Sequence, residues 1–412
     1  MSITSPLLVK KEEYGSLVSP QRNRYTPIYN WHAFKHSFSR ELVENLVNEF
    51  NLEKGSWVLD PFSGGGTTLL ACKDLGINSM GYDILPFSVF LSNVKTRDYD
   101  ERKLRKWLEG FGNFSRTPRT KIELPDISIV DKAFEPKVKQ ELILVKQMIN
   151  EIQETETRGF FMLGLLSILE AVSNTSKDGG FLRIVKRQTP PERVCQIFFE
   201  KIESMISDIE ESNKVRRNRK GNVKAFLGDS RKLPTTRKFH AVITSPPYPN
   251  RHDYTRIYAL ELIFDFVENN DELKRIRYQT LRSHVEARKK YKVDGYSKPA
   301  IIDDLMSQVE SQGTNNPAVT KMLEGYFEDM YLSLSEMSRC LKDNGKIGLV
   351  ISNVRFSGVN IPVDEILAGI GEQVGLLTEG IWVARDRGNS SQQMKEFKRK
   401  PSRESIIIWQ KA

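Results

Sequence analysis

Four consecutive residues, Ser245, Pro246, Pro247 and Tyr248, combine groups that can act on a nucleic-acid base. Prolines fix φ and donate no backbone hydrogen bond, so the chain leaves the preceding apolar run on a rigid path and the Pro246 carbonyl lacks a regular sheet partner. That carbonyl and the Ser245 hydroxyl can both accept from a base amino group, which frees the nitrogen lone pair for attack. Tyr248 offers a flat face for stacking a base taken out of a duplex. We call Ser245–Tyr248 the proline turn.

A glycine-rich turn, Ser63–Gly66, lies between the apolar run Trp57–Leu59 and the helix-like segment Thr67–Cys72. Glycine lets the backbone approach a ligand closely, and the start of a helix offers unpaired N–H groups. No Gly-Lys-Ser/Thr sequence follows, which excludes a P-loop. Asp83 lies about twenty residues farther on, where an acid can bind ribose hydroxyls. The pairing is typical of an adenosine-containing cofactor, although the glycines alone also fit a plain tight turn.

The elements that position these turns alternate between strands and helices. Both turns directly follow a strand-like run, and the alternation predicts a doubly wound α/β sheet. In such sheets ligands bind beyond the carboxyl ends of the strands. The expected strands are Trp57–Leu59, Ser79–Asp83, Phe239–Ile243 and Lys346–Ile351, with a helix at Tyr326–Leu341 and paired strands at Gly380–Ala384 and Ser405–Trp409.

Two stretches interrupt this alternation. Residues 97–221 are largely helix-like and end in the basic run Lys214–Lys220, and residues 271–312 are rich in Arg and Lys. We interpret both as insertions. The predicted organisation is an N-terminal part of the catalytic domain that binds the cofactor (1–96), a helical insertion (97–221), and a C-terminal part (222–412) that carries the basic insertion (271–312).

The string Val58–Thr68 resembles the S-adenosylmethionine-binding motif of the amino-group DNA methyltransferases, which act on N4 of cytosine or N6 of adenine. Residues 27–39 resemble the segment that precedes this turn in that family, and the proline turn matches its catalytic motif. Residues 249–262 resemble the continuation found in a subset. The resemblance covers residues 22–95 and 222–412. It implies a Rossmann-like S-adenosylmethionine-dependent methyltransferase fold with helical insertions.

The resemblance also implies roles for individual residues. The glycine turn would hold the cofactor, Asp83 its ribose, and Asp229 its adenine amino group, although a helix N-cap is the alternative for Asp229. The expected cofactor-binding residues are Asp60, Phe62, Gly64, Gly66, Thr67, Asp83, Asp229 and Phe38. The expected catalytic residues are Ser245, Pro246, Pro247 and Tyr248, and no metal is expected.

The first residue of the proline turn bears on the choice of base. Ser245 preceded by Thr244 is commoner in the cytosine-N4 enzymes of the family, whereas Asp or Asn is more typical of adenine-N6 enzymes. We expect direct in-line transfer of the methyl group to a flipped base, without a covalent enzyme intermediate. The alternatives are an adenine-N6 enzyme, an RNA or protein-amide methyltransferase, and a catalytically inactive DNA-binding subunit of a modification complex.

The cysteines disfavour methylation of cytosine C5, which needs a Cys nucleophile that ordinarily follows a proline. None of Cys72, Cys195 and Cys340 follows a proline. Their odd number and wide separation argue against a disulfide framework, and no pair has metal spacing. The chain also lacks a signal-peptide-like start and a long uncharged apolar run, so we expect no membrane span and a cytoplasmic protein.

The charge balance favours a polyanionic partner, because 62 Lys and Arg oppose 53 Asp and Glu, for a net charge of +9. With the resemblance, the expected partner is double-stranded DNA. A partner restriction endonuclease is implied by the family alone, and no nuclease motif is found. We expect target recognition mainly in 97–221, with a contribution from 271–312. Candidate phosphate contacts are Arg216–Lys220, Arg275–Lys292, Arg251, His252 and Arg256.

Overall fold

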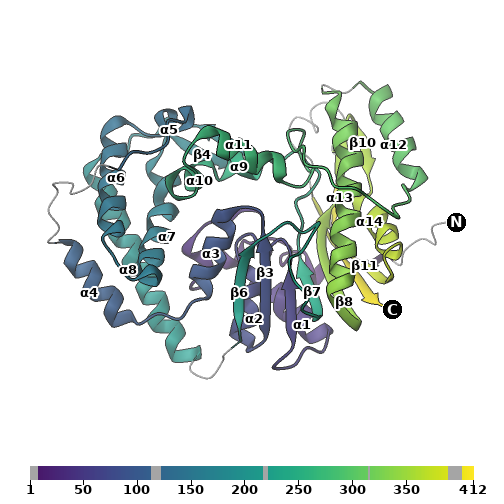
Figure 1. Ribbon diagram of the computed structural model, residues 1–412, viewed down its shortest axis with the longest axis horizontal. Coiled ribbons are helices and arrows are strands. Elements are labelled where there is room, and N and C mark those ends of the chain that lie inside the picture. Colours follow the sequence, from purple (N-terminus) through teal and green to yellow (C-terminus); the bar gives the residue numbers. More distant parts are fainter. Residues whose placement is uncertain (1–7, 113–121, 217–220, 314–315, 388–400) are drawn as a thin grey trace.

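An eight-stranded sheet runs through the middle of the molecule (Figure 1). The computed structural model describes residues 8–112, 122–216, 221–313, 316–387 and 401–412. Within this part of the chain, β12 runs antiparallel to its neighbours, and the remaining strand pairs of the sheet are parallel. The strands, in spatial order, are β1 (Leu8–Lys10), β11 (Leu376–Arg387), β12 (Ser402–Lys411), β8 (Leu341–Ser352), β7 (Phe239–Thr244), β2 (Trp57–Asp60), β3 (Asn78–Asp83) and β6 (Val223–Leu227).

Helices cover both faces of this sheet, because successive strand residues point to opposite sides. Val58 of β2 packs in a cluster with helices α1 (Arg40–Glu49) and α2 (Thr67–Leu75). Its neighbour Leu59 packs in another cluster with α13 (Ala318–Cys340) and α14 (Val363–Glu372). The doubly wound α/β fold predicted from the sequence is therefore confirmed, with α13 and β8 longer than expected.

A helical lobe lies to one side of the sheet, on the left in Figure 1. Its longest helices bury apolar side chains against each other, and α7 is apolar on most of its surface, as expected of a helix with neighbours on several sides. Gly164 of α7 permits close approach of α8, because a Cβ there would collide with Ile202. The lobe consists of α4 (Glu101–Gly112), α5 (Ser128–Ala133), α6 (Pro136–Asn150), α7 (Thr155–Val172), the hairpin β4 (Thr175–Asp178) and β5 (Phe181–Ile184), and α8 (Glu192–Arg216).

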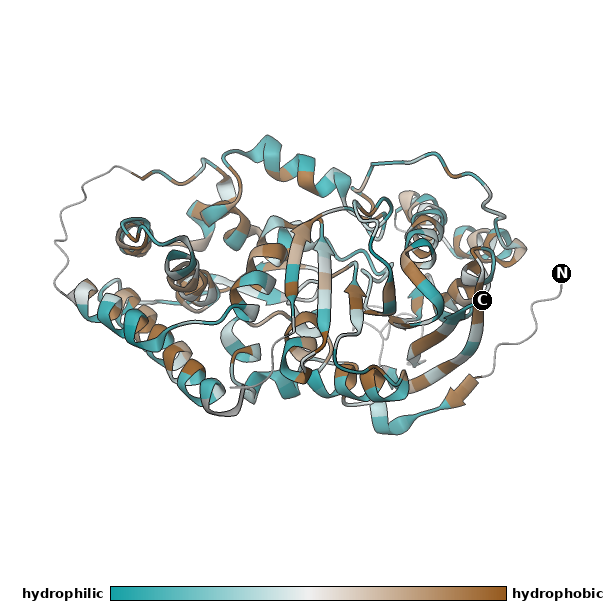
Figure 2. Ribbon diagram, turned by 60° about the horizontal axis from the view of Figure 1, so that its bottom comes forward, coloured by the Kyte–Doolittle hydropathy of each residue, from teal (hydrophilic) through white to brown (hydrophobic). Residues whose placement is uncertain are grey.

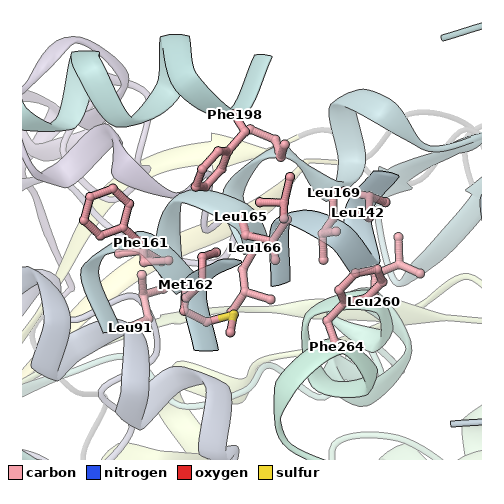
Figure 3. Close-up of a cluster of buried hydrophobic side chains, with 14 of the residues drawn as sticks. Leu91, Leu142, Phe161, Met162, Leu165, Leu166, Leu169, Phe198, Leu260 and Phe264 are labelled. Carbon is pink, nitrogen blue, oxygen red and sulfur yellow. The ribbon is translucent and has the colours of Figure 1, made fainter. Parts of the chain in front are cut away.

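The core of this lobe continues into the sheet domain. Leu91 of α3 (Pro86–Thr96) and Leu260 and Phe264 of α10 (Ala259–Asp265) belong to the same buried cluster as the α7 side chains (Figure 3). Helix α3 follows β3, and α10 follows the proline turn closely in sequence. The lobe is thus packed directly against the elements next to both turns.

Shorter elements complete the described chain. Figure 2 shows hydrophobic residues concentrated on the central strands and two-sided colouring on many of the surrounding helices, as expected for helices with one solvated face. In the described residues, no helix has both the length and the apolar character that a bilayer crossing requires. The shorter elements that complete the described chain are η1 (Glu12–Tyr14), η2 (Arg22–Tyr25), η3 (Tyr29–Trp31), α9 (Tyr254–Ile257), α11 (Asn270–Gln279), α12 (Ala300–Ser311), β9 (Val354–Phe356) and β10 (Val359–Ile361).

Candidate active site

The glycine turn and the proline turn lie side by side, because they follow the neighbouring parallel strands β2 and β7. A buried hydrogen bond joins the two strand ends: the Thr244 hydroxyl donates to Asp60 Oδ1 at 2.6 Å. The Phe62 N–H donates to the same oxygen at 3.1 Å. Burial raises the pKa of Asp60 to about 6, although the hydrogen bonds from Thr244, Thr68 and Phe62 act in the opposite direction. Asp60 therefore ties one turn to the other.

The glycine turn has a conformation that its sequence explains. Gly64 and Gly66 have φ values of 45° and 74°, in the left-handed region where a side chain is unfavourable. A Cβ on Gly66 would also lie 2.8 Å from Ser92 Oγ of α3, and one on Gly65 would lie 3.0 Å from Phe34 Cβ. The turn is thus held between α3 and Phe34, with its backbone at the carboxyl edge of the sheet.

A small cavity of about 70 Å³ lies at the ends of β2, β3 and β6. Asp83 lines it and accepts from the N–H groups of Gly64 at 2.8 Å and Leu85 at 2.9 Å. Burial raises the pKa of Asp83 to about 6, against the effect of those N–H groups. Ser88 also lines this cavity, and its buried hydroxyl has no hydrogen-bond partner among the described residues. Phe62 and Leu281 supply apolar walls.

Asp229 lines the small cavity but is already engaged. Arg231 donates to both of its carboxylate oxygens, at 2.9 and 2.8 Å, and the Tyr291 hydroxyl donates at 2.9 Å. Burial favours its protonation, but the hydrogen bonds and charge of Arg231 outweigh this and hold the pKa of Asp229 below its usual value. Contact between Asp229 and a ligand adenine therefore requires one of these partners to move or to share the carboxylate.

A large cavity of about 730 Å³ lies on the other side of the proline turn. The Tyr248 hydroxyl donates to Glu404 Oε1 at 3.2 Å, and Arg385 Nε donates to Glu404 Oε2 at 2.7 Å, so the C-terminal strand pair positions the tyrosine. The walls of this large cavity include Phe34, Phe38, Gly65, Thr67, Ser245, Pro246, Tyr248, Arg385 and Glu404.

Ser245 lines both cavities, together with Phe34, His36 and Tyr254. Phe34 is held by stacking on Tyr258, with ring centroids 4.6 Å apart and an interplanar angle of 9°. The proline turn therefore lies between two cavities, and Ser245 is its residue that lines both. This arrangement suits the transfer of a group between two ligands.

The structure brings most of the expected site residues to these cavities, with some differences. Phe62, Gly64, Asp83 and Asp229 line the small cavity, and Phe38 and Thr67 line the large one. Asp60 and Gly66 are absent from the described walls of both; Asp60 is buried behind the turn, and Gly66 makes room for α3. Sequence reasoning missed Glu404 and Arg385, because no local motif marks them and strand pairing alone brings them to Tyr248.

The expectation of phosphate contacts along Arg275–Lys292 is wrong for Arg282. This side chain is 6% exposed and pairs with Asp329 and Glu328 of α13, so its charge is satisfied within the protein. Arg277 is likewise paired with Asp253. In the other basic run, residues 217–220 of Arg216–Lys220 lie outside the described residues, and the side chain of Arg216 is not described. Arg251 is exposed.

The cysteines lie away from the chemistry. Cys72 and Cys340 are buried, and burial raises the pKa of both thiols, which disfavours a thiolate nucleophile. Cys195 lies in α8 of the helical lobe. No cysteine is among the described lining residues of either cavity.

Known proteins resemble the chain along most of its length. A family model described as DNA methylase, of the N6/N4 type, matches residues 10–92. The type II methyltransferase M.BsoBI of Geobacillus stearothermophilus is 34% identical, over 96% of this chain and 88% of that protein. M.AvaI of Nostoc sp. is 31% identical, over 96% and 89%. The chain belongs to the N6/N4 DNA methylase family.

Membership in the N6/N4 DNA methylase family makes the protein an S-adenosylmethionine-dependent DNA methyltransferase. Its fold is α/β, and its central sheet consists mostly of parallel strands. A solved structure, TrmN from Thermus thermophilus, aligns with 95% of this chain and 53% of its own, at 10% identity and a TM-score of 0.31, which is too low to support any argument about function.

The described residues fit this cofactor. The unpaired Ser88 hydroxyl and the Asp83 carboxylate supply polar partners for ribose hydroxyls, and Phe62 and Leu281 offer apolar surface for a base. Gly64 of the glycine turn lines the same cavity and presents no side chain to a ligand there. Because the small cavity shares four residues with the large one, a ligand bound there can extend to Ser245.

Proposed function

We propose that this DNA methyltransferase modifies N4 of cytosine in double-stranded DNA, as the modification enzyme of a restriction-modification system. The observation that carries the proposal is the position of Ser245, which lines both cavities and opens the proline turn. A serine at this position favours cytosine N4 over adenine N6 within the family. The type II relatives support the modification role, and a partner endonuclease and a cytoplasmic location belong to the same proposal.

On the cofactor side, adenosine would bind against the walls of the small cavity, which must widen to admit it because about 70 Å³ is less than a nucleoside needs. Asp83 would accept from the ribose hydroxyls, and the Ser88 hydroxyl would donate to or accept from them. Phe62 would contact the adenine, and Gly64 would leave space for the backbone to approach. Asp60, Gly66 and Thr67 would act by fixing the shape of the glycine turn. When bound, S-adenosylmethionine supplies an electrophilic methyl group on a sulfonium.

On the base side, the large cavity would receive a cytosine flipped out of the duplex. Tyr248, fixed by Glu404, would stack on its ring, and the Ser245 hydroxyl and Pro246 carbonyl would accept from its amino group. These acceptors would keep the nitrogen lone pair directed toward the small cavity. Pro246 and Pro247 would hold the acceptors in place, which lowers the entropic cost of alignment.

The helical lobe is our candidate for target recognition within residues 97–221. The turn of its β4–β5 hairpin reaches the large cavity, where Gly179 forms part of the wall and Gly180 packs against His252. Phe181, directly after this turn, is 55% exposed. An exposed aromatic side chain beside a base cavity can contact the DNA next to a flipped nucleotide. Residues 271–312 would contribute less, because Arg277 and Arg282 are paired internally.

The decisive experiment is incubation with radiolabelled cofactor and duplex DNA, followed by digestion to nucleosides. The proposal expects N4-methylcytosine. N6-methyladenine would reverse the choice of base and keep the mechanism, whereas 5-methylcytosine would contradict the mechanism. Cofactor binding without methylation of any DNA would point to an inactive modification subunit.

A further inference from the structure

Lys95, on α3, is a buried cation whose partners are neutral. Lys95 is only 4% exposed, and its ammonium donates to the carbonyls of Tyr29 at 3.1 Å and Gly65 at 3.2 Å. No carboxylate pairs with it among the described residues. Other buried lysines in this protein have one: Lys73 pairs with Asp98, and Lys177 pairs with Glu261. A buried charge that no opposite charge pairs with is energetically costly. Lys95 therefore differs from Lys73 and Lys177, and its charge calls for a partner outside the described residues.

The surroundings of Lys95 make this charge harder to hold. Burial, together with the nearby positive charge of Lys201, lowers the pKa of Lys95 to about 7. An ammonium has three N–H donors, of which the two carbonyls take two. Lys95 also lines the large cavity, so the remaining donor has a place in which to meet a ligand acceptor.

The position of Lys95 relative to the glycine turn indicates which acceptor this is. Gly64 lines the small cavity with Asp83, whereas Gly65 and Thr67 line the large cavity with Lys95. If adenosine lies against Asp83 and the sulfonium faces Ser245, the amino-acid end of the cofactor falls on the Gly65 side. The Ser37 and Thr67 hydroxyls, 2.9 Å apart, add neutral hydrogen-bonding groups there.

We propose that Lys95 binds the carboxylate of the methionine part of S-adenosylmethionine. The carboxylate is the anionic group of this cofactor, and it would compensate the buried charge that no carboxylate in the described part of the chain compensates. The proposal rests on the cofactor alone and is independent of which base is methylated. The competing interpretation is that Lys95 only fastens the glycine turn to the Tyr29 carbonyl.

A thermodynamic cycle separates the two interpretations. Calorimetry would measure the binding of S-adenosylmethionine and of decarboxylated S-adenosylmethionine, which lacks only the carboxylate, to the wild-type protein and to Lys95→Met. We expect the wild type to bind the decarboxylated ligand about tenfold to hundredfold more weakly, as for loss of one charged hydrogen bond. Lys95→Met should bind both ligands equally, at the weaker level.

The controls keep the test decisive. Lys201→Met removes a nearby half-buried cation that is not among the described residues lining the cavity, and it should retain the preference for the carboxylate. Lys95→Gln keeps amide donors for the carbonyls, and thermal unfolding would verify its folding. An equal loss of both ligands in the Lys95 variants would assign Lys95 to the turn alone. If the wild-type protein binds S-adenosylmethionine and its decarboxylated form with equal affinity, the proposal is overturned whatever the variants show.

Discussion

The two cavities that meet at Ser245 are built in different ways. The small cavity lies at the ends of adjacent strands, and its acid, Asp83, is held by backbone N–H groups at Gly64 and Leu85. The large cavity is assembled from chain segments far apart, and its Tyr248 is held by Glu404 of the last strand, 156 residues away. Asp83 on the cofactor side is therefore held by backbone groups of its own and the neighbouring turn, whereas Tyr248 on the base side is held by a side chain from the far end of the chain. Variants at Asp83 and at Tyr248 should therefore affect different ligands.

Ser245→Ala changes the residue of the proline turn that lines both cavities, and we expect it to cause the largest loss of methylation rate. Loss of one acceptor for the base amino group should lower single-turnover methylation about a hundredfold, by analogy with removal of one preorganised hydrogen-bonding group in other active sites. Cofactor affinity, measured by calorimetry, should change less than about twofold, because the ribose and adenine contacts remain. A parallel loss of cofactor affinity would mean that Ser245 belongs to the cofactor side.

Tyr248→Ala removes the stacking surface on the base side. We expect binding of a flipped base to weaken by about tenfold or more, because one base–aromatic stack contributes about 1–3 kcal/mol. The fluorescence of 2-aminopurine at the target position would report the flipping. Tyr248→Phe is the matched control, since it keeps the ring and loses only the hydrogen bond to Glu404. Equal defects in the two variants would favour a positioning role for the hydroxyl.

Asp83 gives the cofactor side a pH dependence. Its pKa of about 6 is raised by burial, so the carboxylate is charged above that pH and becomes protonated below it. A protonated Asp83 loses acceptor strength toward ribose, and cofactor affinity should fall as the pH drops through about 6. Asp83→Asn should bind about tenfold more weakly at pH 8 and show a flatter profile. A loss of affinity at falling pH that remains in this variant would be assigned to Asp60, whose pKa is also about 6. Lys95 would act with the opposite sign, because its ammonium loses its proton as the pH rises through about 7.

Phe181→Ala tests whether the helical lobe contributes to the base side, and it should have the smallest effect. We expect DNA affinity to fall by about threefold to tenfold, with cofactor affinity unchanged, because the side chain is exposed next to the large cavity. Electrophoretic mobility shifts with a cognate duplex would measure it. Ile184→Ala, at another exposed position of the same strand, is the control for general loss of apolar surface. Unchanged DNA binding in Phe181→Ala would place the DNA elsewhere.

The sequence alone determined the features that depend on local backbone demands. Glycines with positive φ at Gly64 and Gly66, and consecutive prolines after β7, mark the two turns without reference to the rest of the chain. Strand and helix patterns then predicted the doubly wound sheet, which places both turns at one edge. For that reason the fold class was predictable from the residues, whereas S-adenosylmethionine and the family followed from the resemblance of Val58–Thr68 and Ser245–Tyr248 to the amino-group DNA methyltransferases.

Only the tertiary structure decided which side chains serve these turns. Arg282 was an expected phosphate contact, yet it is buried against Asp329. Glu404 carried no motif, yet it holds Tyr248. No motif marked Lys95, yet it donates to the Gly65 carbonyl of the glycine turn and has no carboxylate partner among the described residues. A side chain's partners come from whichever segments pack against it, and packing brings together residues that sequence separation hides.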